Sequence, residues 1–237
     1  MEQNFIAVDI ETTGLSPIKD KIIEIGAAKV KNGKIVETFS RLIDPKIKLP
    51  KRIVELTGIS DHMLSGQEII ETVLYDFLTF AEELPLLGHN IIFDYSFLKT
   101  AYVKEKISFE RRGIDTLYIS RILHAEIESK SLERMCKLYG ITNENHHRAY
   151  DDAIASMELY ECLAKEGNAT SDMLAAKPLF YKPKKMEPIT QKQKNYLLDL
   201  LKYHKIEIKQ SIDLMTKSEA SRTIDRILFQ YGRKTTD

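Results

Sequence analysis

The chain has 237 residues, of which 43% are hydrophobic and 30% charged, and its 35 Lys and Arg balance 35 Asp and Glu. This composition excludes an intrinsically disordered chain, and no apolar run approaches the roughly 20 residues that span a bilayer. The first residues lack the basic stretch of a signal peptide, and the two cysteines, Cys136 and Cys162, fit buried residues of a reducing compartment. We therefore expect a soluble, cytoplasmic protein without membrane contact.

The charges are divided unevenly along the chain. Residues 1–167 contain 21 basic and 27 acidic residues, whereas residues 168–237 contain 14 basic and 8 acidic residues. A basic C-terminal part favours contact with a polyanion such as nucleic acid, although a solvated basic face would give the same composition.

The first 43 residues predict a three-stranded meander. Residues 4–10 form an apolar stretch typical of a buried strand, and residues 21–30 are rich in β-branched side chains. Asn32-Gly33 is a dipeptide that two-residue hairpin turns favour, and a third strand follows over residues 34–43.

Helices then alternate with short strands. Residues 67–84 carry apolar side chains at the spacing of an amphipathic helix, namely Ile69, Ile70, Val73, Leu74, Phe77, Leu78 and Ala81. After a short strand within residues 84–90, Asp94 takes the N-cap position of the next helix. Four further segments complete the pattern: a helix within 52–60, a strand and helix within 114–126, a helix within 131–141, and a long helix within 146–166. A meander followed by this alternation predicts an α/β domain with a mixed sheet.

The composition changes after Gly167. Residues 168–188 contain three prolines and few periodic apolar residues, which is typical of a linker or of a segment that wraps around a domain. Residues 190–206 and 216–232 predict two helices, each of which opens with a threonine in the N-cap position. The sequence therefore predicts a first domain over residues 1–167, a linker over 168–188, and a small basic helical module over 189–237.

Four acids lie at the ends of predicted elements of the first domain. Asp9 and Glu11 fall on the same side of the first strand, while Asp94 and Asp152 lie near the starts of helices. Carboxylates that meet at one end of a sheet repel each other unless divalent cations neutralise them, and Mg²⁺ and Mn²⁺ prefer oxygen ligands. A pair of such ions roughly 3.5–4 Å apart suits the hydrolysis of a phosphodiester.

A histidine near the fourth acid completes this set. His147 lies five residues before Asp152, in the loop ahead of the long helix, where its imidazole is placed to accept a proton from water without binding a metal ion. Taken singly, each motif has a simpler explanation: an exposed strand end for Asp9 and Glu11, a helix cap for Asp94, and a solvated helix start for residues 146–152. The hypothesis of a metal site depends on their occurrence together and in order.

The stretches VDIETTGL, GHNIIFDYSFL and HHRAYDDA resemble the three sequence blocks of the DEDDh exonucleases, the DnaQ-like 3′→5′ exonucleases known as proofreading domains and subunits. The resemblance covers residues 4–165. It implies a ribonuclease H-like fold with a mixed five-stranded sheet flanked by helices. It also implies that two divalent cations, Mg²⁺ or Mn²⁺, are bound by four acids and that a histidine acts as the general base; the residues concerned are Asp9, Glu11, Asp94, Asp152 and His147.

The spacing of the third block also admits His146 with Asp151, but His147-Arg148-Ala149 followed by Asp152-Ala153 fits it better. The resemblance further implies contacts with the 3′-terminal nucleotide. Thr12 would meet the terminal sugar and phosphate, Leu15 would wedge beside the terminal base, and Phe97 would line the pocket, with His89 and Asn90 beside the site. For Leu15 and Phe97, a simple place in the core is the alternative.

The sequence thus predicts a metal-dependent 3′→5′ exonuclease that releases nucleoside 5′-monophosphates, with DNA favoured. The expected partners are nucleic acid with a free 3′ end and a DNA polymerase or repair complex, in proofreading or DNA repair. The alternatives are an exoribonuclease of the same fold that trims RNA, and a nucleic-acid-binding module without catalytic activity.

Overall fold

The structure, a computed structural model, describes residues 1–143, 146–183, 187–208 and 211–233. It divides into two compact units, Met1–Pro183 and Lys184–Asp237, and each is described here by itself. Among the described residues, no helix has both the length and the apolar character needed to cross a membrane.

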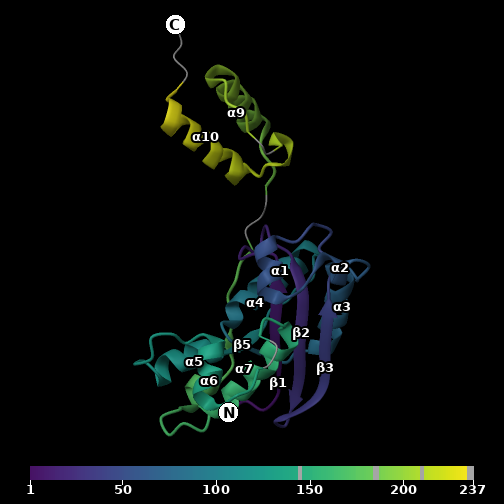
Figure 1. The fold of residues 1–237 in the computed structure, drawn as a ribbon, viewed down its shortest axis with the longest axis vertical. Coiled ribbons are helices and arrows are strands. Elements are labelled where there is room, and N and C mark those ends of the chain that lie inside the picture. The colour runs from purple at the N-terminus through teal and green to yellow at the C-terminus, as the bar shows by residue number, and fades with distance from the viewer. Residues whose placement is uncertain (144–145, 184–186, 209–210, 234–237) are drawn as a thin grey trace. The chain divides into compact units, whose positions relative to one another are not determined.

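A mixed six-stranded sheet forms the centre of the first unit, in the order β3-β2-β1-β4-β5-β6 (Figure 1). The strands are β1 (Phe5–Thr12), β2 (Ile22–Lys31), β3 (Lys34–Leu42), β4 (Leu86–Gly88), β5 (Arg112–Asp115) and β6 (Lys177–Pro178). The first three form the predicted antiparallel meander, β4 and β5 extend it in parallel with β1, and β6 is antiparallel. The turn between β2 and β3 has positive φ at both Asn32 (53°) and Gly33 (70°), as the hairpin dipeptide predicted.

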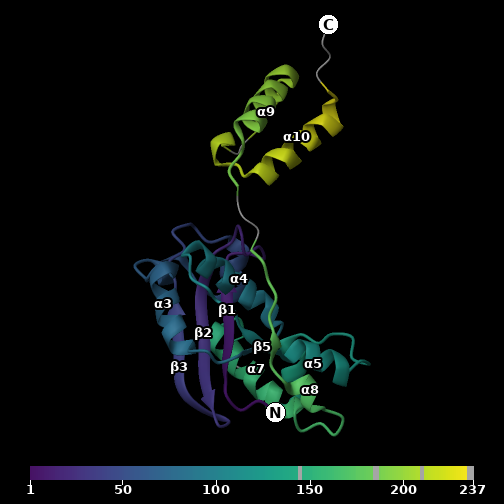
Figure 2. The same cartoon turned by 180° about the vertical axis from the view of Figure 1, so that it is seen from behind.

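Helices cover both faces of this sheet (Figures 1 and 2). They are α1 (Lys51–Thr57), α2 (Asp61–Leu64), α3 (Ile70–Ala81), α4 (Ile91–Lys104), α5 (Thr116–Leu123), α6 (Leu132–Tyr139), α7 (Ala149–Leu163) and α8 (Ser171–Leu174). On one face α3 and α4 pack against alternate β1 residues, Ile6, Val8 and Ile10. On the other face α5, α6 and α7 pack against Phe5 and Ala7. Because strand residues alternate between faces, Asp9 and Glu11 belong to the face of α7.

The structure corrects three details of the sequence-based prediction. The helix expected to begin at Asp94 begins one turn earlier at Ile91, so Asp94 lies in its first turn and Asn90, with φ of 69°, takes the N-cap position. The predicted apolar face of α3 included Ile69, but Ile69 is the exposed N-cap residue of this helix. Phe80, which the prediction did not include, is buried.

The third correction concerns the predicted linker and the expected number of strands. Residues 168–183 belong to the first unit, where they form α8 and a sixth strand, β6, so this part of the segment follows the alternative of a wrapping segment. The Arg112 guanidinium donates to the Ala176 carbonyl oxygen at 2.6 Å, and Leu179 covers Gly113, which leaves no room for a Cβ there. A two-residue strand is too short to give a recognisable sequence pattern.

The second unit consists of α9 (Gln191–His204) and α10 (Lys217–Tyr231), with one 3₁₀ turn at Ile212–Leu214. The predicted N-caps, Thr190 and Thr216, both form capping boxes with the residue three positions later. Apolar residues of the two helices and of the turn before α10 form a separate small core: Leu197, Leu200, Leu201, Met215, Ile224 and Ile227.

Candidate active site

The first two acids lie near the C-terminal end of β1, where this strand pairs with β2. Asp9 lies opposite Gly26 on β2, and Glu11 lies opposite Glu24, just before an irregularity between Glu11 and Thr12. Both acids are partly buried and share the face on which α7 packs.

The third acid reaches β1 from α4. An Asp94 side-chain oxygen, Oδ1, accepts a hydrogen bond from the Ile10 backbone N–H at 3.1 Å. Ile10 lies between Asp9 and Glu11 in the strand, so this bond holds the Asp94 carboxylate at the end of β1 that carries the other two acids. Asp94 is only 3% exposed.

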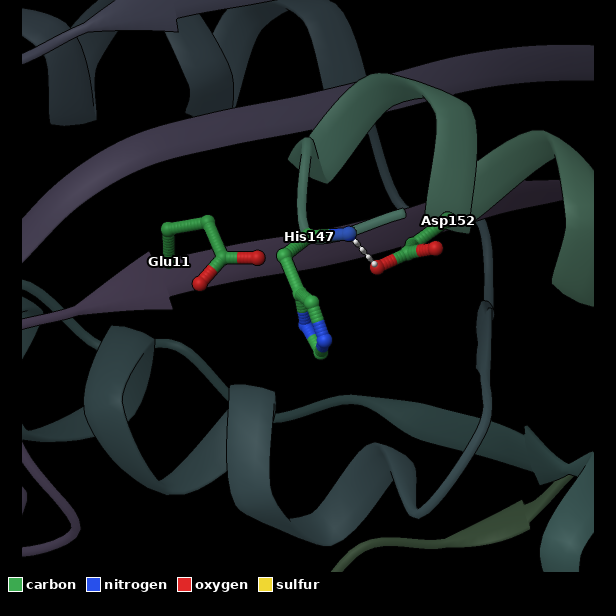
Figure 3. Close-up of side chains that lie close together, drawn as sticks. All are labelled: Glu11, His147 and Asp152. Carbon is green, nitrogen blue, oxygen red and sulfur yellow. Dashed lines mark hydrogen bonds between the residues drawn. The ribbon is translucent and has the colours of Figure 1, made fainter. Parts of the chain in front are cut away.

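The fourth acid and the histidine come from the start of α7. Asp152 lies in the first turn, where its Oδ2 accepts from the His147 backbone N–H at 3.2 Å and its Oδ1 accepts from Asn143 Nδ2 at 2.6 Å. Ligand atoms of Glu11, His147 and Asp152 all lie within 4.8 Å of one another. Figure 3 shows the Glu11 and Asp152 carboxylates on either side of His147.

Burial raises the pKa values of all four carboxyl groups, and repulsion by neighbouring acids adds to the shift of Asp9, Glu11 and Asp94. Burial, followed by the charges of Asp152, Glu24 and Asp94, raises the pKa of Glu11 to about 8, although Arg148 partly lowers it. Burial is also the main cause for Asp94, whose pKa rises to about 8 although two backbone N–H groups oppose the shift. The pKa of Asp9 is raised well above its usual range, by burial and then by Asp94 and Asp152.

Burial raises the pKa of Asp152 as well, although the hydrogen bonds from Asn143 and His147 stabilise its charged form. The protein alone therefore disfavours four ionised carboxylates at this position. Such a cluster fits a site for hard divalent cations, because carboxylate oxygens are their preferred ligands and the cations remove the repulsion.

Two further residues that hold α7 in place were missed from the sequence. Glu24 is only 1% exposed and forms an ion pair with Arg148, and at Gly26 an added Cβ would lie 2.0 Å from the Tyr150 backbone nitrogen. An acid inside the apolar stretch at the start of a strand and a glycine two residues later were the available signals.

The loop after β1 holds Leu15 out of the core. The Thr12 hydroxyl donates to the Gly14 carbonyl oxygen at 2.7 Å, and the Asp20 carboxylate accepts from the Ser16 backbone N–H at 2.8 Å. Leu15 is 83% exposed at the tip of this loop, which excludes the alternative that it is a core residue.

The other expected substrate contacts have structural partners of their own. Both ring nitrogens of His89 are engaged, Nδ1 with the Thr116 hydroxyl at 2.9 Å and Nε2 with the Lys130 carbonyl oxygen at 2.7 Å. Asn90 is exposed, and its backbone N–H donates to Asp115. Phe97 is 2% exposed and packs in the core on the sheet face opposite to Asp9, so the structure agrees with its alternative place in the core.

Comparison with known proteins matches most of the chain to an exonuclease family. The family model RNase_T, described as exonuclease, matches residues 6–160. A DNA polymerase III of PolC type from Clostridium perfringens is 39% identical over 178 residues, which are 75% of this chain. The chain spans only about 12% of the length of that relative.

Solved structures share the fold at low sequence identity. The nuclease domain of 3'hExo, a DEDDh family member bound to rAMP, matches with a TM-score of 0.61 and 18% identity, over 75% of this chain and 98% of that one. Exonuclease X in complex with 5′ overhanging duplex DNA matches with a TM-score of 0.57 and 24% identity, over 72% of this chain and 97% of that one.

Proposed function

The chain belongs to the exonuclease family, and from this premise we propose that it is a 3′→5′ exonuclease of the DEDDh branch, which hydrolyses DNA from the 3′ end to nucleoside 5′-monophosphates. The observation that carries the proposal is the convergence of four desolvated carboxylates and a histidine at one end of β1. DNA is favoured because the relative at 39% identity is a DNA polymerase.

The four acids, Asp9, Glu11, Asp94 and Asp152, would hold two divalent cations, Mg²⁺ or Mn²⁺. When bound, these ions neutralise charge on the scissile phosphate and make a water molecule more acidic. The Asn143 amide and the His147 backbone N–H hold the Asp152 carboxylate, so that acid keeps a fixed orientation.

His147 is proposed as the general base. Its side chain is exposed and its ring lies beside the Glu11 and Asp152 carboxylates, so a nitrogen is free to take the proton of the attacking water. Thr12, the last residue of the acidic strand, and the exposed Leu15, in the loop that follows it, would contact the terminal nucleotide.

The second unit is proposed to hold the nucleic acid. Arg222, Arg226 and Phe229 follow one another at the four- and three-residue spacing of a single helix face on α10. Both arginines are exposed without an ion pair among the described residues, and Phe229 is 92% exposed. Cationic and aromatic side chains on one face suit the phosphates and bases of a single strand.

An exoribonuclease that trims RNA is the second candidate, since one structural neighbour holds rAMP, but at 18% identity that likeness shows the fold alone. A binding module without activity is disfavoured because all five catalytic-type residues are present.

A cleavage assay separates the DNA exonuclease, the exoribonuclease and the inactive binding module. It uses labelled single- and double-stranded DNA and RNA, with free or blocked 3′ ends and with Mg²⁺ or Mn²⁺. Release of 5′-monophosphates only from free 3′ ends is expected, and intact strands under every condition would refute the proposal.

A polymerase or repair complex is the proposed partner, in the cytoplasm, because the PolC-type relative is a DNA polymerase. Co-purification of a tagged chain with a polymerase tests this role in proofreading. Purification of the exonuclease alone from growing cells would argue for a role outside replication.

A further inference from the structure

An ion pair with a buried carboxylate joins β2 to the residue that follows His147: the Glu24 side chain is 1% exposed, whereas the Arg148 side chain is 37% exposed. Arg148 Nη2 lies 2.8 Å from Glu24 Oε1, and Arg148 Nε lies 3.2 Å from both carboxylate oxygens. The Ala149 backbone N–H, at the start of α7, donates to Glu24 Oε2 at 3.0 Å. One carboxylate therefore binds a side chain and a backbone group on adjacent residues of the same loop.

The backbones of β2 and α7 approach each other at Gly26 more closely than a residue with a Cβ would allow. At Gly26, two residues after Glu24, an added Cβ would lie 2.0 Å from the Tyr150 nitrogen and 2.2 Å from the Ala149 carbonyl carbon. The start of α7 therefore lies directly on the backbone of β2, opposite Asp9.

His147 has an uncommon backbone conformation between these fixed points. Its φ is 65°, in the left-handed region that residues with a Cβ adopt rarely and at some cost. Its own N–H is held by Asp152, and the next residue is held by Glu24. The conformation is thus fixed from both sides.

The ion pair is more than the attachment of α7 requires. Met157, Leu159, Tyr160 and Leu163 already bury the helix against the sheet. Such a partly buried ion pair adds little stability over apolar residues of similar size, because desolvation of the Glu24 carboxylate offsets the attraction between the two charges. Glu24 also adds a negative charge opposite Glu11. A charge that adds little stability and increases the repulsion on Glu11 points to a role other than stability.

We propose that Glu24 and Arg148 are positioning residues, which fix the loop before α7 so that the His147 imidazole stays beside the Glu11 and Asp152 carboxylates. This inference rests on the proposed function, in which His147 takes the proton of the attacking water. Neither Glu24 nor Arg148 touches the reacting atoms in this scheme.

The test is the double variant Glu24→Gln/Arg148→Met. It removes both charges together, and the glutamine keeps an acceptor for the Ala149 N–H, so neither partner is left buried and unpaired. We expect thermal stability and Mn²⁺ affinity close to those of the wild type, unchanged KM, and a kcat about 10-fold to 100-fold lower, the cost of a small displacement of a catalytic group. A double variant with wild-type kcat would show that the pair is only structural.

A matched control lies on the same strand. Lys29 of β2 is 6% exposed and pairs with Glu37 at 2.6 Å and with Glu82 at 3.1 Å, away from the acids. Glu82 also pairs with Lys31, so it keeps a basic partner when Lys29 is replaced. Lys29→Met/Glu37→Gln is expected to keep full kcat, and an equal loss in this control would overturn the proposal.

The conservative variant Arg148→Lys keeps the positive charge but loses the bidentate contact with Glu24. Its kcat is expected to lie between those of the wild type and the double variant, and a kcat equal to that of the double variant would refute the need for a cation at this position.

A readout without turnover separates this inference from the proposed function. The imidazole resonance of His147, assigned by its loss in His147→Gln, is expected to shift in Glu24→Gln/Arg148→Met and to stay in place in the Lys29 control. Wild-type protein that cleaves no nucleic acid would refute the proposed function alone. An unmoved resonance would refute the positioning role even if the wild type is active.

Discussion

Glu11 and Glu24 lie directly opposite each other on β1 and β2, yet of the two only Glu24 forms an ion pair among the described residues. Glu24 pairs with Arg148, whereas Glu11 lies among other acids, and its pKa is raised to about 8 although Arg148 partly lowers it. The protein therefore compensates the charge of Glu24 internally and leaves most of the Glu11 charge uncompensated. A partly buried acid of this kind is what a cation-binding position requires, since the ion supplies the missing charge.

Replacement of the first acid tests the site assignment. Asp9→Asn is expected to lower kcat by at least about 10³-fold, because a cation ligand is lost from a site whose electrostatics stabilise the transition state. The same change removes one charge from a repelling cluster, so the cation-free protein should melt no earlier than the wild type. Hydrolysis rates and thermal unfolding in EDTA measure the two effects. Asp151→Asn on the same helical turn as Asp152 is the control, and substantial turnover by Asp9→Asn would refute the assignment.

The acids also predict how stability depends on pH. For Glu11 the folded-state pKa of about 8 lies above its ordinary value of 4.5, so the folded chain binds more protons than the unfolded chain between these values. The free energy of unfolding without cations should therefore fall as pH rises from about 5 to about 8. Mn²⁺ binds the deprotonated form, so the gain in melting temperature on its addition should be larger at the upper end of this window. Melting curves with EDTA or Mn²⁺ test both trends, and cation-independent curves would contradict them.

Replacement of His147 tests whether this residue acts as a general base or as a metal ligand. Its ring lies close enough to Glu11 and Asp152 to bind the same ion, whereas the proposed mechanism needs it free. His147→Ala should then lower kcat about 10²-fold to 10⁴-fold, the usual contribution of a general base, while Mn²⁺ affinity measured by calorimetry is kept. Asp152→Asn should weaken Mn²⁺ binding under the same conditions. A comparable loss of affinity in both variants would identify His147 as a ligand.

Local patterns in the sequence were sufficient for the elements and for the acids at their ends. The meander follows from Asn32-Gly33 and the flanking strands, and the threonine caps of α9 and α10 follow from Thr190 and Thr216. The contacts that bring α7 to β2 were not predicted, because Glu24 and Arg148 are 124 residues apart and neither marks the end of an element. Phe97 was ambiguous because an aromatic residue near a site and one in the core have the same local pattern.

Gly26 makes a stability prediction that involves no charge. Gly26→Ala places a Cβ against the Tyr150 backbone nitrogen, and since backbone cannot rotate away, the start of α7 must move. We expect a loss of about 1–3 kcal/mol in the free energy of unfolding, the usual cost of overpacking. Gly167→Ala is the matched control, since nothing lies within 4 Å of its Cβ. Equal stability of the two variants, measured by urea denaturation, would show that the contact is looser than described.

The last prediction concerns the second unit and where to cut the chain. Because residues 168–183 pack on the first unit, removal of residues 184–237 should leave the exonuclease fold intact, whereas removal from residue 168 also deletes β6. The shorter deletion is expected to weaken binding of single-stranded DNA and to lower the slope of log affinity against log salt, because phosphate contacts release counterions. Arg222→Gln/Arg226→Gln should reproduce much of this loss, and Lys192→Gln/Lys202→Gln on exposed positions of α9 is the charge-matched control.

Fluorescence anisotropy at several salt concentrations, with the Asp9→Asn background to prevent cleavage, measures both the affinity and its salt dependence. Identical affinity and slope with and without residues 184–237 would exclude the module from substrate binding, and equal losses in the α9 control would attribute binding to net charge rather than to the face of α10 that carries Phe229.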